Sequence, residues 1–125
     1  MDEKHAPIFA ALRELYCTHE ADCVVLNDEP DRYHLGTHEV RQKDGYRTEL
    51  GGVHARKSYV SAYLMPVYIH PDLLDDISPD LKNRMQGKSC FNFKKMDETL
   101  LAEFGALVQR GVTRFRDEGR FTPRD

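Results

Sequence analysis

The chain has little of what marks secreted, membrane-spanning or disulfide-stabilised proteins. It contains three cysteines, an odd number, and no CxxC motif. This argues against a disulfide framework and against a structural zinc site, and it favours a reducing, cytoplasmic location. No apolar run approaches the roughly 20 residues that span a bilayer. Residues 1–12 open acidic and hold no sustained apolar stretch, so we expect no signal peptide.

A strong excess of one charge is also missing. The 18 basic and 21 acidic residues give a formal net charge of −3. This small value provides no electrostatic footprint for general nucleic-acid binding and no polybasic face for a membrane. The arginines of residues 110–124 lie among acidic neighbours, which indicates a solvated helix face. We therefore predict neither nucleic acid nor a membrane as a partner.

The common catalytic motifs are absent as well. The sequence has no Walker loop, no GxGxxG, no GxSxG and no HExxH. Their absence lowers the odds of the commonest phosphate-binding, dinucleotide-binding and metal-hydrolytic enzymes. An enzyme stays open, because active sites are often assembled from distant residues. We lean towards a protein that is not an enzyme.

What is present is the composition of one globular domain. The 125 residues are 40% hydrophobic and 31% charged, a balance that predicts a packed core. We treat residues 1–125 as a single domain and expect the polar tail, residues 117–125, to fray.

The longest strand-like run covers residues 57–71, KSYVSAYLMPVYIHP. Alternation places Tyr59 and Tyr63 on one face and Val60 and Leu64 on the other, and both faces are rich in apolar residues. This predicts a strand near the middle of a sheet, with a covering layer on each side. Pro66 is awkward there, because proline cannot donate to a strand ladder, and it predicts a bulge or one-sided pairing.

Before this run the pattern predicts one helix and three strands. The expected ranges are a helix at 7–19, a strand at 23–26 that ends in turn formers at 27–31, a strand at 33–41, and a strand at 46–53. Asp44-Gly45 favours a tight hairpin between the last two strands. Gly51-Gly52 interrupts the third strand, which indicates a bulge or a close backbone approach.

After the central run the pattern predicts short helices, a strand and a long helix. The expected ranges are a short helix at 71–76, another that Ser78 caps and Gly87 ends, a strand at 88–95, and a helix that Asp97 caps and that runs to about residue 115. Together these elements predict an α+β fold, with an antiparallel sheet of about five strands covered by N- and C-terminal helices.

Several segments of the second half resemble one known family. They are RKSYV at 56–60, Ser78-Pro79 with Leu81, GKSCFNFKK at 87–95, and Asp97-Glu98 at the start of the last helix. The pattern, which spans about residues 53–115, resembles the YdhG-like family of small bacterial domains of unknown function. The resemblance implies a frataxin-like α+β fold and no particular activity.

One group of candidate ligand-binding residues lies on or beside the central run: Arg56, Tyr59, Tyr63 and His70. Aromatic walls with cationic ends suit a small anionic ligand, if part of the sheet is left uncovered. The competing interpretation is that the tyrosine rings belong to the core and the cations are solvated strand ends.

A second group combines carboxylates with a histidine: Glu20, Asp22, Asp28, Asp31 and His34. Oxygen and imidazole donors together suit iron(II), manganese or zinc. Some frataxin-like proteins bind iron through an acidic ridge and deliver it to iron–sulfur assembly, so the resemblance implies iron here as an alternative. The competing interpretation is an ordinary solvated loop. His34 and His38 lie too far apart along a strand to share one ion.

Cys90 is a third candidate, because the nearby Lys88 can lower a thiol pKa and raise its reactivity. A small packing residue is the competing and preferred interpretation. Taken together, the sequence favours a binding module for a small molecule or a protein partner, without a cofactor. The alternative is an iron-binding chaperone. An exposed edge strand allows either a monomer or a homodimer.

Overall fold

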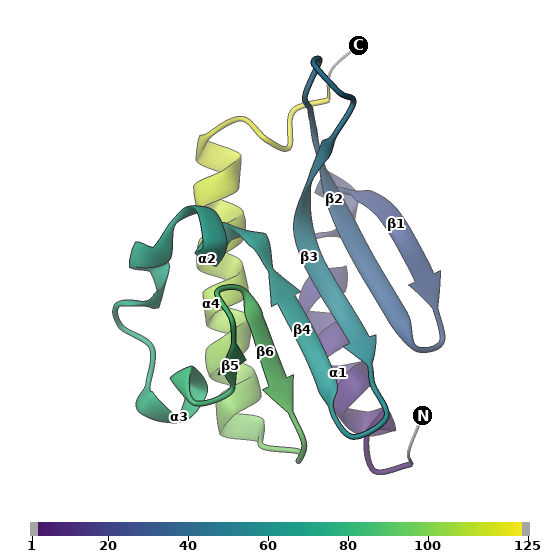
Figure 1. Ribbon diagram of the computed structural model, residues 1–125, viewed down its shortest axis with the longest axis vertical. Coiled ribbons are helices and arrows are strands. Elements are labelled where there is room, and N and C mark those ends of the chain that lie inside the picture. Colours follow the sequence, from purple (N-terminus) through teal and green to yellow (C-terminus); the bar gives the residue numbers. More distant parts are fainter. Residues whose placement is uncertain (1–2, 124–125) are drawn as a thin grey trace.

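The computed structural model describes residues 3–123. Helices occur at both ends of this part of the chain, and the strands lie between them (Figure 1). In chain order the elements are α1 (Ala6–Cys17), η1 (Glu20–Asp22), β1 (Val24–Glu29), β2 (Arg32–Val40), β3 (Arg47–Ala55), β4 (Val60–Leu64), α2 (Met65–Ile69), η2 (Pro71–Leu74), α3 (Pro79–Lys82), β5 (Met85–Gln86), β6 (Cys90–Phe93) and α4 (Glu98–Asp117).

The strands form one six-stranded sheet in the order β1-β2-β3-β4-β6-β5, and every neighbouring pair is antiparallel. The predicted α+β class is therefore confirmed. The sheet has one strand more than expected, because Met85 and Gln86 pair with β6 instead of ending a helix. Gly87, predicted as a helix stop, has φ 74° and lies in the turn between β5 and β6.

Both long helices lie on the same face of the sheet (Figure 1). The strand residues on that face are buried, and Val60, Leu64 and Phe91 are completely inaccessible. The apolar stripe of α4 packs onto them, and Asp97 caps its first turn by accepting a hydrogen bond from the Leu100 N–H at 3.0 Å. The other face of β2, β3, β4 and β6 carries no helix within residues 3–123. The prediction that both sides of the central strand are covered is therefore wrong.

The central run is a strand only in its first half. β4 ends at Leu64, and Met65–Ile69 form the short helix α2 with Pro66 in its first turn. Proline needs no N–H donor at that position, which removes the difficulty that it posed within a strand. Pro66 is buried against α4, where a Cβ atom on Gly111 would lie 2.9 Å from its ring.

Two turns differ in length from their prediction. The turn formers at 27–31 were expected to end the first strand, yet β1 continues to Glu29 and only Pro30 and Asp31 form the turn. A bulge between Val25 and Asn27 lets the strand continue along β2. The hairpin at Asp44-Gly45 forms where it was predicted, but its loop is longer than a tight turn, since β2 ends at Val40 and β3 begins at Arg47. Gly45 has φ 73°, and the Arg41 guanidinium binds the Asp44 carboxylate.

The segment after α4 contacts the sheet, in place of the fraying expected from residue 117. The His38 N–H donates to the Arg120 carbonyl at 2.9 Å, and the Phe121 side chain is only 8% exposed. Arg124 and Asp125 lie outside the described residues.

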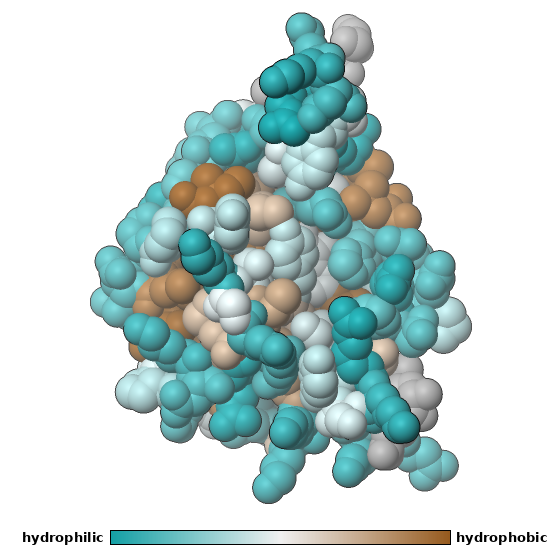
Figure 2. All heavy atoms as spheres, viewed as in Figure 1, coloured by the Kyte–Doolittle hydropathy of each residue, from teal (hydrophilic) through white to brown (hydrophobic). Residues whose placement is uncertain are grey.

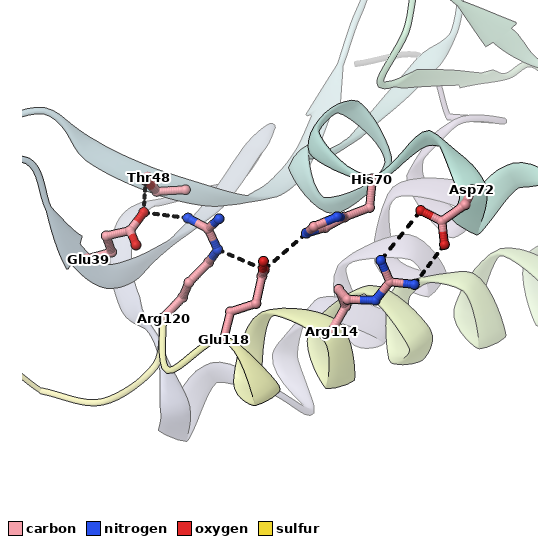
Figure 3. Close-up of polar contacts among 7 residues, drawn as sticks. All are labelled: Glu39, Thr48, His70, Asp72, Arg114, Glu118 and Arg120. Atoms are coloured by element: carbon pink, nitrogen blue, oxygen red, sulfur yellow. Dashed lines mark hydrogen bonds and ion pairs between the residues drawn. The ribbon is translucent and has the colours of Figure 1, made fainter.

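Arg120 joins three parts of the fold (Figure 3). Its guanidinium binds Glu39 of β2 and Glu118 at the end of α4, and it lies 4.8 Å from the centre of the Phe115 ring. Glu118 also pairs with His70 at 3.0 Å. Partial burial opposes ionisation of Glu118, but the bonds from Arg120 and His70 outweigh it and lower the pKa of this carboxyl. Glu118 thus stabilises the fold at neutral pH, and this contribution is lost as pH falls through its lowered pKa.

We expect Arg120→Met to lower the free energy of unfolding by about 1–3 kcal/mol, because Glu39 and Glu118, both partly buried, each lose their bond to the guanidinium. Methionine keeps an apolar stem against Phe115, so the loss reports mainly on the charge. Urea denaturation measures it. The matched control is Arg41→Met, which removes an exposed, solvent-screened pair with Asp44 and is expected to lower the free energy of unfolding less than Arg120→Met does. If both variants lowered the free energy of unfolding equally, Arg120 would not stabilise the contact between β2 and the end of α4.

Candidate functional site: the open face of the sheet

The uncovered face of the sheet is crossed by a line of directly paired residues, one from each strand. We call this line the central row. Its members are Asn27, His34, Gly52, Tyr63, Cys90 and Gln86. They come from six strands that span residues 24–93, so only the sheet register brings them together.

Gly52 leaves a gap in the middle of the central row. It sits between His34 and Tyr63 and has no side chain to stand between them. A Cβ atom there would lie 2.2 Å from the Tyr33 carbonyl oxygen and 2.7 Å from Cγ of His34. The backbone therefore packs too closely for any other residue. The gap is thus a missing side chain in the row: the His34 ring leans over Gly52 from one side, and Tyr63 faces it from the next strand.

The side chains that flank this gap offer hydrogen bonds and little net charge. His34 Nδ1 lies 3.5 Å from a carboxylate oxygen of Glu49, and both side chains are partly exposed. On the other side, the Tyr63 hydroxyl donates to the sulfur of Met65 at 3.4 Å. Burial, with a smaller effect from Glu49, raises the pKa of Tyr63, so its phenol stays neutral.

A second row runs beside the central row on the same face. It consists of Glu29, Arg32, His54, Ser61 and Asn92. Burial, assisted by Arg56 and Arg32, lowers the pKa of His54, so this imidazole is neutral at pH 7. Asn92 is held by a 2.6 Å hydrogen bond to Gln86. Figure 2 shows the middle of this face as weakly polar, with hydrophilic residues and several hydrophobic patches around it.

The residues predicted to bind a small ligand are only partly brought together. Tyr63 lies in the central row. Arg56 and Tyr59 lie at the turn between β3 and β4, where the Arg56 N–H donates to the Tyr59 carbonyl at 2.8 Å. His70 does not join them, because it follows α2 and its ring contacts Phe115 and Glu118.

The residues predicted to bind a metal are dispersed. Asp22 pairs with Arg116 at 2.9 Å, Asp28 pairs with Arg13 at 3.0 Å, and Glu20 accepts a hydrogen bond from the Tyr33 hydroxyl. Asp31 lies in the turn between β1 and β2, and His34 points to the open face. Within residues 3–123 no three His, Cys, Asp or Glu side chains are grouped so that they could hold a metal ion. The five residues therefore do not form one centre, and iron binding stays a prediction.

The sequence missed several members of this face, among them Glu49, His54 and Gln86. Strict alternation along β3 would place Glu49 on the same face as the buried Val53. Only the irregularity in the pairing of β2 with β3, between Leu35 and Gly36, brings Glu49 beside His34. Cys90, predicted as either a reactive thiol or a packing residue, is a free and partly buried thiol beside Tyr63. Lys88 lies in the turn that precedes β6, outside the central row.

Comparisons of the chain with protein-family models, with curated proteins and with solved structures find no match. The resemblance to the YdhG-like family thus stays a prediction. None of the helices in residues 3–123 has the length and apolar character to cross a membrane.

Proposed function

We propose that the protein is a non-enzymatic binding domain that holds a small, flat, hydrogen-bonding molecule on the open face of its sheet. The observation that carries this proposal is the gap at Gly52 in the central row. It is flanked by an imidazole and a phenol, which can stack on a ring and also hydrogen-bond to its edge.

The chemistry of the face favours binding over catalysis. A nucleophile needs a base within hydrogen-bonding distance. Among the described residues, Tyr63 donates to a thioether, and Cys90 makes no hydrogen bond to a histidine. This part of the face is suited to recognising a neutral or weakly charged ring, because burial keeps Tyr63 beside the gap and His54 in the second row uncharged.

An NMR screen of the ¹⁵N-labelled protein with small heteroaromatic fragments tests this proposal. We expect some fragments to shift the amide signals of His34, Gly52 and Tyr63 and to bind saturably. Tyr63→Ala is expected to weaken these fragments about tenfold, because it removes roughly 1.4 kcal/mol of contact. Tyr63→Phe keeps the ring and is expected to retain most of the affinity.

Tyr46→Ala is the matched control, since Tyr46 is an exposed tyrosine on the hairpin and outside the central row. It is expected to leave fragment binding unchanged. A library in which no fragment shifts the central row would overturn the proposal. So would fragments whose affinity responds equally to Tyr63→Ala and Tyr46→Ala.

A further inference from the structure

A groove lies beyond the β5 end of the central row, where several short elements meet. It is formed by α2, η2, α3, β5 and the turn into β6, and its volume is about 550 Å³. Its wall includes Val67, Tyr68, Leu74 and Met85, and its rim carries Lys82 and Lys88. This volume is within the range of roughly 300–1,000 Å³ that is typical of small-molecule sites.

The wall of the groove leaves apolar surface exposed to water. Tyr68 is 53% exposed although it belongs to a helix that packs on the core, and its neighbour Ile69 is 38% exposed. Met85 and Leu74 are only partly buried beside it. Methionine has three rotatable bonds and adapts to irregular ligands, so this wall suits a flexible apolar chain or a ring.

The rim of the groove is positively charged, although the protein as a whole is acidic. Within residues 3–123 neither Lys82 nor Lys88 forms an ion pair, and no acidic side chain lines the groove. Two acids adjoin lining residues in the chain: Asp72, which is bound to Arg114 at 2.7 Å (Figure 3), and Asp75, which follows Leu74 but does not itself line the groove. The two ammonium groups are therefore available to an anion from solution.

We propose that this groove binds small anionic amphipathic molecules, with the anionic head at Lys82 and Lys88 and the apolar part against Tyr68 and Met85. Charge complementarity at the rim and apolar surface on the wall select the same class of ligand. This site shares no residue with the central row, so it goes beyond the binding proposed for the sheet.

Calorimetric titration of the full chain with decanoate, below its micelle concentration, tests the proposal. We expect saturable binding that weakens as salt is added, because surface charges are screened. Decanol has the same chain without the charge, and acetate has the charge without the chain. Both are expected to bind more weakly than decanoate.

The double variant Lys82→Gln, Lys88→Gln is expected to weaken decanoate binding by about 3- to 30-fold, the range for loss of two partly screened contacts. The matched control, Lys43→Gln with Lys57→Gln, makes the same charge change on exposed turns far from the groove and is expected to leave affinity unchanged. Tyr68→Ala tests the wall without touching a buried side chain.

Absence of saturable decanoate binding would overturn the proposal. Equal weakening by the two lysine pairs would also overturn it, because the attraction would then be one of overall charge. Amide shifts that cluster on the central row instead of the groove would assign the ligand to the sheet face and likewise contradict this site.

Discussion

Gly51→Ala is expected to lower the free energy of unfolding by about 4 kcal/mol or more, a large part of the roughly 5–15 kcal/mol that stabilises a typical domain. Gly51 has φ 146°, a backbone conformation that side chains with a Cβ rarely adopt. A Cβ atom there would lie 1.9 Å from the Tyr63 carbonyl oxygen, and backbone cannot move aside as a flexible side chain can. The variant must therefore separate β3 from β4 in the middle of the sheet.

Gly45→Ala is the matched control for this prediction. Gly45 also has a positive φ, 73°, but a Cβ atom there meets nothing within 4 Å. Gly45→Ala should therefore lower the free energy of unfolding by only about 1 kcal/mol, the cost of holding alanine at a positive φ. Circular dichroism and urea denaturation of both variants measure the difference. If both alanine variants lowered the free energy of unfolding by the same amount, the close approach of β3 to β4 at Gly51 would be contradicted.

Phe104→Ala is expected to lower the free energy of unfolding by about 3–5 kcal/mol, the range for truncating a buried aromatic residue. Phe104 is completely buried, and its ring lies 4.9 Å from Phe91 and 5.7 Å from Phe93 of β6, measured between ring centres. It also contacts Tyr16 of α1 at 6.3 Å. One side chain of α4 therefore joins both long helices to the sheet.

Thermal and urea denaturation measure this effect, and Phe104→Leu separates lost volume from lost ring contacts. The leucine variant is expected to recover part of the stability, since it fills most of the cavity. Tyr46→Ala is the control, because truncating this exposed side chain should lower the free energy of unfolding by about 0.5 kcal/mol or less. A Phe104→Ala protein as stable as Tyr46→Ala would contradict the central place of this ring.

Much of the fold could be predicted from local patterns. The stripe of α4, the caps at Ser78 and Asp97, and the inward-facing Phe91 and Phe93 are all confirmed, because helical spacing and strand alternation are strong signals over such lengths. α2 was missed because its five residues, MPVYI, are β-branched or aromatic in part and too few to show a helical period. β5 was also missed because it is short: its two residues are too few to show the alternation of a strand.

The candidate site was less predictable than the fold. Tyr63 and His34 were each singled out from the sequence, but for different ligands and from segments about thirty residues apart. Only the register of β2, β3 and β4 places them on either side of Gly52. The acidic residues looked like a cluster in the sequence, yet alternation and the arginines of α1 and α4 draw Asp22 and Asp28 to separate partners.

The position of α4 in the chain affects how the protein is made. Ribosomes synthesise α4 after every strand, and until it emerges the apolar face of the sheet is covered by α1 alone. A chain that is released before residue 98 therefore exposes Val60, Phe91 and Phe93 to solvent and to other copies of itself. Such a chain is prone to aggregation, because exposed apolar strands pair with one another.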